Sequence, residues 1–392
     1  MTRLTLVRRL WSDSTLLRHL LVAVLGVVAI TAVLTAVSDF RSVQLAEMAY
    51  LGTAAGGLTV LTGLNGQISL GHGALMAFGA YTTALLLPDL EASTPLVLVV
   101  LAAVLVTLAV GSVVGVAAAR LHGPYLAGAT VALAVAVPGI ALFYKQTLGG
   151  EQGIPVVLPP TPQWALDAGY YLTGTDPSRS KFVAYVAWLT LIATFFLLAN
   201  LSRSRVGRRW RAVRDDEVAA ELAGINLGRA RVSAFMVSAA AAGAAGAMLA
   251  ISVRLAAPGS FTLTLSLTLL AAVVLGGLGS LTGALLGAAL LTFLPQVVTD
   301  LGTDAGLDNI QAAELAPLVY GLVMVLVVLL APLGIAGTLR SLMLRHRHQD
   351  RHRGPTQTTG QTTVQTTGQT TDQATGPDTP GAISTTSKGT SP

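Results

Sequence analysis

Residues 48–88 read MAYLGTAAGGLTVLTGLNGQISLGHGALMAFGAYTTALLLP and contain no Asp, Glu, Lys or Arg. A continuous helix of this length would reach about 60 Å, because an α-helix rises ~1.5 Å per residue, whereas the hydrocarbon core of a bilayer is about 30 Å thick. The run must therefore fold back on itself. Near its middle, GLNGQ at residues 63–67 has the glycine content typical of a turn. We predict two membrane helices joined there.

Further uncharged runs lie on both sides of this segment. Residues 255–299 are long enough for two spans and contain a second glycine-rich break, GGLGS, at residues 276–280. The remaining runs have the length of one span each and cover residues 20–38, 92–119, 121–144, 182–202, 232–253 and 315–339. The sum predicts an all-α fold, a polytopic transmembrane helical bundle of about ten spans. The first run is too long for the apolar region of a signal peptide, so we interpret it as an uncleaved span.

The composition agrees with a membrane protein and excludes several other classes. Hydrophobic residues make up 53% of the chain and charged residues 11%, against roughly 25% charged residues in soluble domains. The chain has no cysteine, which excludes disulfides, thiolate metal sites and thiol nucleophiles. It also contains no G-x-x-x-x-G-K-[ST], H-E-x-x-H or G-x-S-x-G motif, so we expect neither an ATP-binding loop of its own nor catalysis.

The arginines predict which side of the membrane each loop faces. Arginines gather before the first span, at Arg120, between residues 203 and 231, and after the last span, whereas the alternate loops are mildly acidic. Because cytoplasmic loops carry the excess of positive charge, an even number of spans places both termini in the cytoplasm. The longest opposite loop, residues 149–181, either contacts an external partner or simply caps the bundle.

These features divide the chain into four regions. Residues 1–18 form a basic cytoplasmic N-terminus, and residues 19–340 form the transmembrane domain with a cytoplasmic loop at residues 203–231. A basic cytoplasmic segment, 341–353, follows. Residues 354–392 repeat Thr, Gln and Gly with few apolar side chains, so we expect this tail to be disordered.

The loop at residues 203–231 contains one predicted short amphipathic helix. Asp215 or Asp216 can cap its N-terminus and Gly224 can follow its last residue. Since so short a helix is marginal alone in water, its apolar strip must pack either on its own membrane domain or in a groove of a soluble ATPase. The apolar strip consists of Val218, Leu222, Ala219 and Ala223. The candidate docking residues are Asp215, Asp216, Glu217, Val218, Ala219, Ala220, Glu221, Leu222, Ala223 and Gly224.

Three segments resemble a known family. VAAELAGIN resembles the E-A-A-x-x-x-G coupling segment of ABC importer permeases, with Val218 where the motif has Glu and Gly224 at its glycine. The whole of RDDEVAAELAGINLGRARVSAFMVSAAAAGAAGA, residues 214–247, is similar to permeases of branched-chain amino acid importers. So are GLNGQISLGHGALMAFGAY, residues 63–81, and VVLGGLGSLTGALLGA, residues 273–288. The resemblance covers about residues 43–335.

The resemblance implies a role and a set of partners. Such importers contain two permease subunits, usually a heterodimer of related chains, with two cytoplasmic ABC ATPases and an external substrate-binding protein. The chain looks like the larger of the two permease types, in a bacterial plasma (inner) membrane. ATP and Mg²⁺ would bind to the ATPases. This chain would bind no cofactor. The implied cargo is a branched-chain or other hydrophobic amino acid, with urea or a short amide as the alternative.

Polar residues within the first long run are candidates for the translocation path. Asn65, Gln67, Ser69 and His72 cluster there, and polar groups at membrane depth are costly unless they are partnered or face water. Alternatively, they satisfy backbone groups freed by the turn. A secondary transporter would need an intramembrane carboxylate, which the uncharged runs lack, and a passive channel would leave the cytoplasmic helix unexplained. The glycines of these runs, Gly71, Gly73, Gly79, Gly243 and Gly246, favour close helix packing.

Overall fold

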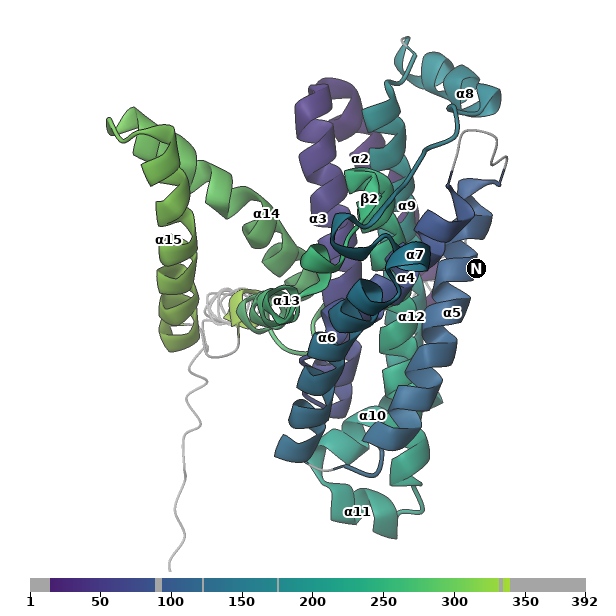
Figure 1. Cartoon of the computed structure of the whole chain (residues 1–392). Coiled ribbons are helices and arrows are strands. Elements are labelled where there is room, and N and C mark those ends of the chain that lie inside the picture. Colours follow the sequence, from purple (N-terminus) through teal and green to yellow (C-terminus); the bar gives the residue numbers. More distant parts are fainter. Residues whose placement is uncertain (1–14, 89–93, 122, 175, 331–333, 339–392) are drawn as a thin grey trace, which may run out of the picture. The chain divides into compact units, whose positions relative to one another are not determined.

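The computed structural model describes residues 15–88, 94–121, 123–174, 176–330 and 334–338. The chain divides into two units, Met1–Arg345 and His346–Pro392. Most of the predicted N-terminal region, the basic segment 341–353 and the tail 354–392 lie outside the described residues. Figure 1 shows that the described part of the first unit is built from helices.

Ten helices of 14 residues or more occur in the described part, one for each predicted span. The all-α, polytopic membrane fold is confirmed. Seven of the ten are long and apolar enough to cross a membrane, if α13 is counted together with the turn before it. The three that do not meet this criterion are α3, α4 and α15. The ten helices are α2 (Thr15–Ala36), α3 (Asp39–Leu58), α4 (His72–Leu86), α5 (Leu96–Ala118), α6 (Pro124–Phe143), α9 (Arg179–Arg203), α12 (Leu227–Val253), α13 (Leu263–Gly276), α14 (Leu281–Asp304) and α15 (Asn309–Leu330).

Both predicted breaks are present. After α3 the chain forms a π-helical turn, η1 (Thr59–Leu64), and residues 66–71 are not helical before α4 begins. The second break separates α13 from α14, and the Ser280 side chain caps α14 by accepting a hydrogen bond from the Gly283 amide at 3.1 Å. The sequence placed the start of the first hairpin at residue 48, but α3 begins at Asp39, because Ser38 caps the helix and its polar first turns continue it.

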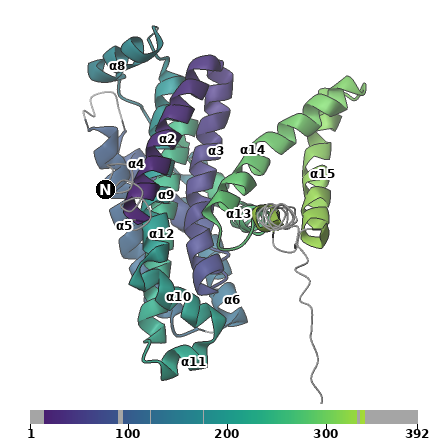
Figure 2. The same cartoon turned by 180° about the vertical axis from the view of Figure 1, so that it is seen from behind.

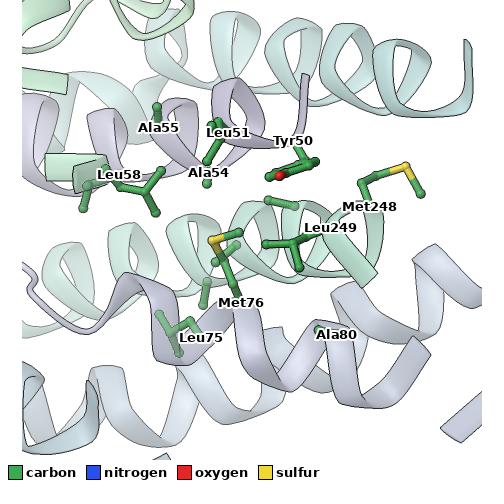
Figure 3. Packing of buried hydrophobic residues seen from close by; sticks show 14 of the residues in the cluster. Tyr50, Leu51, Ala54, Ala55, Leu58, Leu75, Met76, Ala80, Met248 and Leu249 are labelled. Atoms are coloured by element: carbon green, nitrogen blue, oxygen red, sulfur yellow. The ribbon is translucent and has the colours of Figure 1, made fainter. Parts of the chain in front are cut away.

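Helix α12 forms the centre of the bundle. It packs against α3, α4 and α5, and Figure 3 shows side chains of α3, α4 and α12, such as Leu58, Met76 and Leu249, pointing toward one another. Small residues allow this close approach: a Cβ at Gly246 would stand 1.9 Å from the Met76 carbonyl oxygen, and one at Gly79 would stand 2.2 Å from that of Gly243. The packing role predicted for these glycines agrees with these distances.

The segments between the long helices contain shorter elements. After α6 come α7 (Lys145–Leu148), η2 (Gly150–Gln152), β1 (Ile154–Pro155) and α8 (Gln163–Thr173), and after α12 come β2 (Leu255–Ala256) and η3 (Pro258–Phe261). The sequence did not predict that β1 and β2 pair antiparallel, with Ile154 opposite Ala256. This pairing joins two loops about 100 residues apart in the chain, a separation that local sequence patterns cannot report.

Candidate functional site

The loop after α9 contains two helices, not the single one predicted. The first, α10 (Arg205–Asp215), is capped by Ser204, whose hydroxyl accepts from the amides of Val206 and Gly207. Trp210 is fully buried and its indole Nε1 donates to Ser233 Oγ at 2.9 Å. The signal in the sequence was the spacing of Val206, Trp210 and Val213, which lie on one helical face. Helix α10 is therefore anchored to α12, and the second helix of the loop follows directly from it.

The second helix, α11 (Glu217–Leu222), is the predicted short helix. Asp216 caps it by accepting a hydrogen bond from the Ala219 amide at 3.0 Å. Gly224 follows it with φ +80°, a conformation that favours glycine. Asp215 is the last residue of α10 instead, and its carboxylate lies 2.7 Å from Arg214 Nη2.

The apolar strip of α11 faces away from the rest of the described chain. Val218 is 69% exposed and Leu222 is 85% exposed, and Ala219 and Ala223 are exposed as well. Only Ala220 of this helix is buried. The alternative in which Val218 and Leu222 pack on their own membrane domain is therefore not what the structure shows. Helix α11 and α8 lie at opposite ends of the 25-residue helix α9 (Figure 1 and Figure 2).

Two arginines connect this loop to the first helix break, and no local sequence pattern predicted either connection. Arg214 Nη1 donates to the carbonyl oxygen of Gly63 at 2.7 Å. Arg231, near the start of α12, forms an ion pair with Glu217 of α11 at 2.6 Å. Both partners lie far from their arginine in sequence or on another helix, so only the fold brings them together.

The four polar residues predicted for the path are all buried and lie at the first break. Gln67 Nε2 donates to Asn65 Oδ1 and, at 3.3 Å, to the carbonyl oxygen of Arg231. Ser69 Oγ accepts from the Gly71 amide at 3.4 Å. His72, at the start of α4, has its ring 3.6 Å from where a Gly57 Cβ would stand. Ser69 thus bonds a backbone amide of the turn, as the alternative interpretation predicts, whereas Gln67 bonds the Asn65 side chain and a carbonyl of α12.

Residues outside the predicted set also stabilise this break. Thr130 of α6 accepts a hydrogen bond from the Leu70 amide at 3.0 Å, and Ser266 of α13 accepts one from the Gly73 amide at 2.9 Å. These hydroxyls satisfy donors that the interrupted helix leaves without intrahelical partners. The break is consequently held by side chains from two other long helices.

A large apolar groove lies elsewhere in the bundle. Its volume is about 1640 Å³, and α2, α5, α9 and α12 contribute most of its lining. None of the four polar residues at the first break lines it. Its surface is predominantly aliphatic, with Thr31, Thr190 and Asn200 among the few polar contributors. A groove of this character at membrane depth suits hydrocarbon better than a zwitterionic solute.

Comparison with known proteins gives a consistent set of relatives. Residues 43–328 match the family model described as branched-chain amino acid transport system / permease component. The chain is 34% identical to the high-affinity branched-chain amino acid transport system permease protein LivM of Salmonella typhimurium, over 75% of this chain and 69% of the relative. It is 33% identical to the protein of the same name from Escherichia coli K12, over 71% of this chain and 66% of the relative.

A third relative is covered more fully. The chain is 29% identical to the high-affinity branched-chain amino acid transport system permease protein BraD of Pseudomonas aeruginosa, over 72% of this chain and 89% of that protein. The chain thus spans about two thirds of the length of the two LivM relatives and most of BraD. No solved structure matches the chain.

Proposed function

The chain belongs to the family of branched-chain amino acid transport permeases, and from this premise we propose that it forms the translocation path of an ATP-driven, binding-protein-dependent importer. It is a multi-pass membrane protein and a transport subunit, not an enzyme. In the importer this subunit would change conformation in response to ATP binding and hydrolysis on the partner ATPases. The exposed apolar strip of α11 is the observation that carries this proposal.

Helix α11 has the properties of a helix that inserts into a groove of a partner. Val218 and Leu222 are four residues apart and form one exposed apolar ridge, while the small side chains of Ala219 and Ala223 permit close approach. The ridge is followed by Gly224 and stands on α10, which Trp210 fixes to α12. An exposed ridge on a fixed base loses little conformational entropy on docking.

The partners of this subunit follow from the same role. Two cytoplasmic ABC ATPases bind ATP and Mg²⁺ and dock on α11, one on each permease. A second, related permease subunit completes the membrane pair, and an extracytoplasmic binding protein delivers the solute. The chain lies in the bacterial plasma (inner) membrane with both termini in the cytoplasm, which agrees with the arginines of residues 203–231 lying beside α11.

The proposed cargo is a branched-chain or other hydrophobic amino acid. The printed names of the relatives support this choice. Asn65, Gln67, Ser69 and His72 would line the path when the first break opens, since they are the polar groups gathered at the interruption of a membrane helix. Uptake of labelled leucine by the complete assembly, competed with valine, phenylalanine and urea in turn, tests this assignment. If urea alone competed, the assigned cargo would be a short amide and not an amino acid.

The docking role is tested by two substitutions in α11. Leu222→Asp places a charge on the exposed ridge, and Gly224→Arg puts a bulky side chain at φ +80°. Loss of a central interface contact costs about 2 kcal/mol or more, so ATPase binding should weaken at least about 30-fold and uptake should fall with it. Abundance in the membrane should stay near wild type, because neither side chain packs in the bundle.

The matched control is Arg209→Gln, which alters an exposed polar side chain of the neighbouring helix α10, outside the candidate docking residues. This variant should transport solute at the wild-type rate and retain the ATPases during purification. Wild-type uptake by Leu222→Asp would refute a docking role for α11.

A further inference from the structure

The two glycine-rich breaks of the chain contact each other directly. A Cβ placed on Gly63 would stand 2.2 Å from the Gly279 amide nitrogen and 2.7 Å from its Cα. Such distances mean that the backbone of η1 lies against the backbone of the break between α13 and α14. We call this contact between Gly63 and Gly279 the break junction. It joins the interruptions of the two helical hairpins at a single point.

Arg214 binds the break junction from the cytoplasmic loop. Its Nη1 donates to the Gly63 carbonyl at 2.7 Å, and its Nε and Nη2 donate to Asp215 Oδ1 at 2.9 and 2.7 Å. The aliphatic part of the side chain contacts the turn as well, because a Cβ on Gly66 would be 3.0 Å from Arg214 Cγ. A single guanidinium therefore connects the end of α10 with a carbonyl of the π-helical turn. Such turns frequently occur at functional sites.

Arg231 makes the second connection, from α11 to the other side of the same break. Its side chain is only 7% exposed, and its Nη2 lies 2.6 Å from Glu217 Oε1. Its Nη1 donates to the Ala119 carbonyl at 3.4 Å. Its own carbonyl accepts the hydrogen bond from Gln67 Nε2. Arg231 thus contacts the first residue of α11 through its guanidinium and the segment that leads into α4 through its backbone carbonyl.

We propose that Arg214 and Arg231 are positioning residues that transmit movement of the docked α11 to the break junction, and so open the path at the first helix break. The inference rests on the proposed function of α11 as the docking helix. The two connections contact the two ends of the break in the sequence, one at Gly63 and one at Gln67. A displacement of the α10–α11 loop therefore acts on both sides of residues 63–67. Without these connections a displacement of the loop would not act directly on the backbone of residues 63–67.

The test uses the complete assembly in proteoliposomes and measures three quantities: ATPase retained with the permease, ATP hydrolysed, and solute imported per ATP. Arg214→Gln removes the charge-assisted hydrogen bond to Gly63, so import per ATP should fall about tenfold or more. ATPase retention should stay within about twofold of wild type, because Arg214 lies outside the exposed ridge of α11. Arg214→Lys keeps a cationic donor and should restore part of the import per ATP.

A second variant keeps the proposal testable if Arg214→Gln fails to fold. Glu217→Gln changes a half-exposed side chain and removes the negative charge that pairs with the buried Arg231 guanidinium. It should also lower import per ATP while the ATPases remain bound. The matched control is Arg209→Gln, an exposed arginine of the same helix α10, which should leave all three quantities unchanged.

Each outcome decides between the two proposals. Unchanged import per ATP in Arg214→Gln and Glu217→Gln would overturn the transmission role. Loss of the ATPases from these variants would also overturn it, by assigning both residues to the docking surface and leaving the proposed function intact. Wild-type ATPase binding by Leu222→Asp, measured in parallel, would instead overturn the proposed docking role of α11.

Discussion

Single glycines decide how closely the membrane helices of this chain approach one another. At Gly246 a Cβ would lie 1.9 Å from the Met76 carbonyl oxygen, and at Gly63 a Cβ would overlap Gly279. By contrast, a Cβ at Gly128 of α6 would meet nothing within 4 Å. Glycines that look alike in the sequence therefore differ completely in what a methyl group would encounter.

Gly246→Ala should destabilise the bundle because α4 and α12 must separate to accept the methyl group. Overpacking of this kind costs about 1–3 kcal/mol, which corresponds to a melting temperature lower by about 2–6 °C in detergent. Scanning fluorimetry of the purified subunit measures the shift. Gly128→Ala is the control and should leave the melting temperature unchanged or raise it, since alanine favours helix. Equal melting temperatures for the two variants would contradict the packing described for α12.

At the scale of the element, α11 is a six-residue helix that depends on its ends. The Asp216 cap and the positive φ of Gly224 define those ends, and the Glu217–Arg231 ion pair holds the helix to α12. A helix of this length has too few internal hydrogen bonds to persist alone. The exposed ridge of Val218 and Leu222 is presented only while these end contacts hold.

Asp216→Ala should loosen α11 without changing the bundle. Loss of an N-cap costs about 1 kcal/mol, so the amides of residues 217–222 should exchange with deuterium about fivefold faster. Asp216→Asn keeps a capping oxygen and should exchange like wild type, which separates capping from charge. Hydrogen–deuterium exchange with peptide-level mass spectrometry makes the comparison. Fast exchange in the Asn variant too would show that the carboxylate charge, and not the cap, holds the helix.

At the scale of the whole molecule, the long helices give the chain two distinct ends. Helix α9 runs 25 residues from Arg179 to Arg203, which is about 37 Å at ~1.5 Å per residue and enough to cross a bilayer. Helix α8 precedes it and α10 follows it, so the two lie on opposite sides of the membrane. The basic residues at the α10 end favour the cytoplasm for that end.

The absence of cysteine makes this orientation simple to measure. Tyr171 of α8 is 91% exposed, and Leu222 is similarly open. In intact spheroplasts a membrane-impermeant maleimide should label Tyr171→Cys and not Leu222→Cys. After lysis both should react. Labelling of Leu222→Cys in intact spheroplasts would invert the topology and place the docking helix outside the cell.

Much of the architecture could be predicted from local patterns. Uncharged runs gave the ten long helices, glycine clusters gave both breaks, and Asp216 and Gly224 bounded α11, because span length, turn chemistry and capping depend on neighbouring residues. Helix α10 was missed although its periodicity is visible, because the many arginines of this loop concealed the spacing of Val206, Trp210 and Val213.

The sequence by itself thus determined that this chain is a helical membrane protein with two interrupted hairpins and a short capped helix between spans. Only the tertiary structure decided that the two breaks touch, that Gly63 accepts a hydrogen bond from Arg214, 151 residues away, and that Gln67 reaches Arg231, 164 residues away. The physical reason is the separation along the chain over which each kind of interaction acts. Helix formation and turns are governed by residues a few positions apart, whereas these contacts exist only after packing has brought distant backbones together.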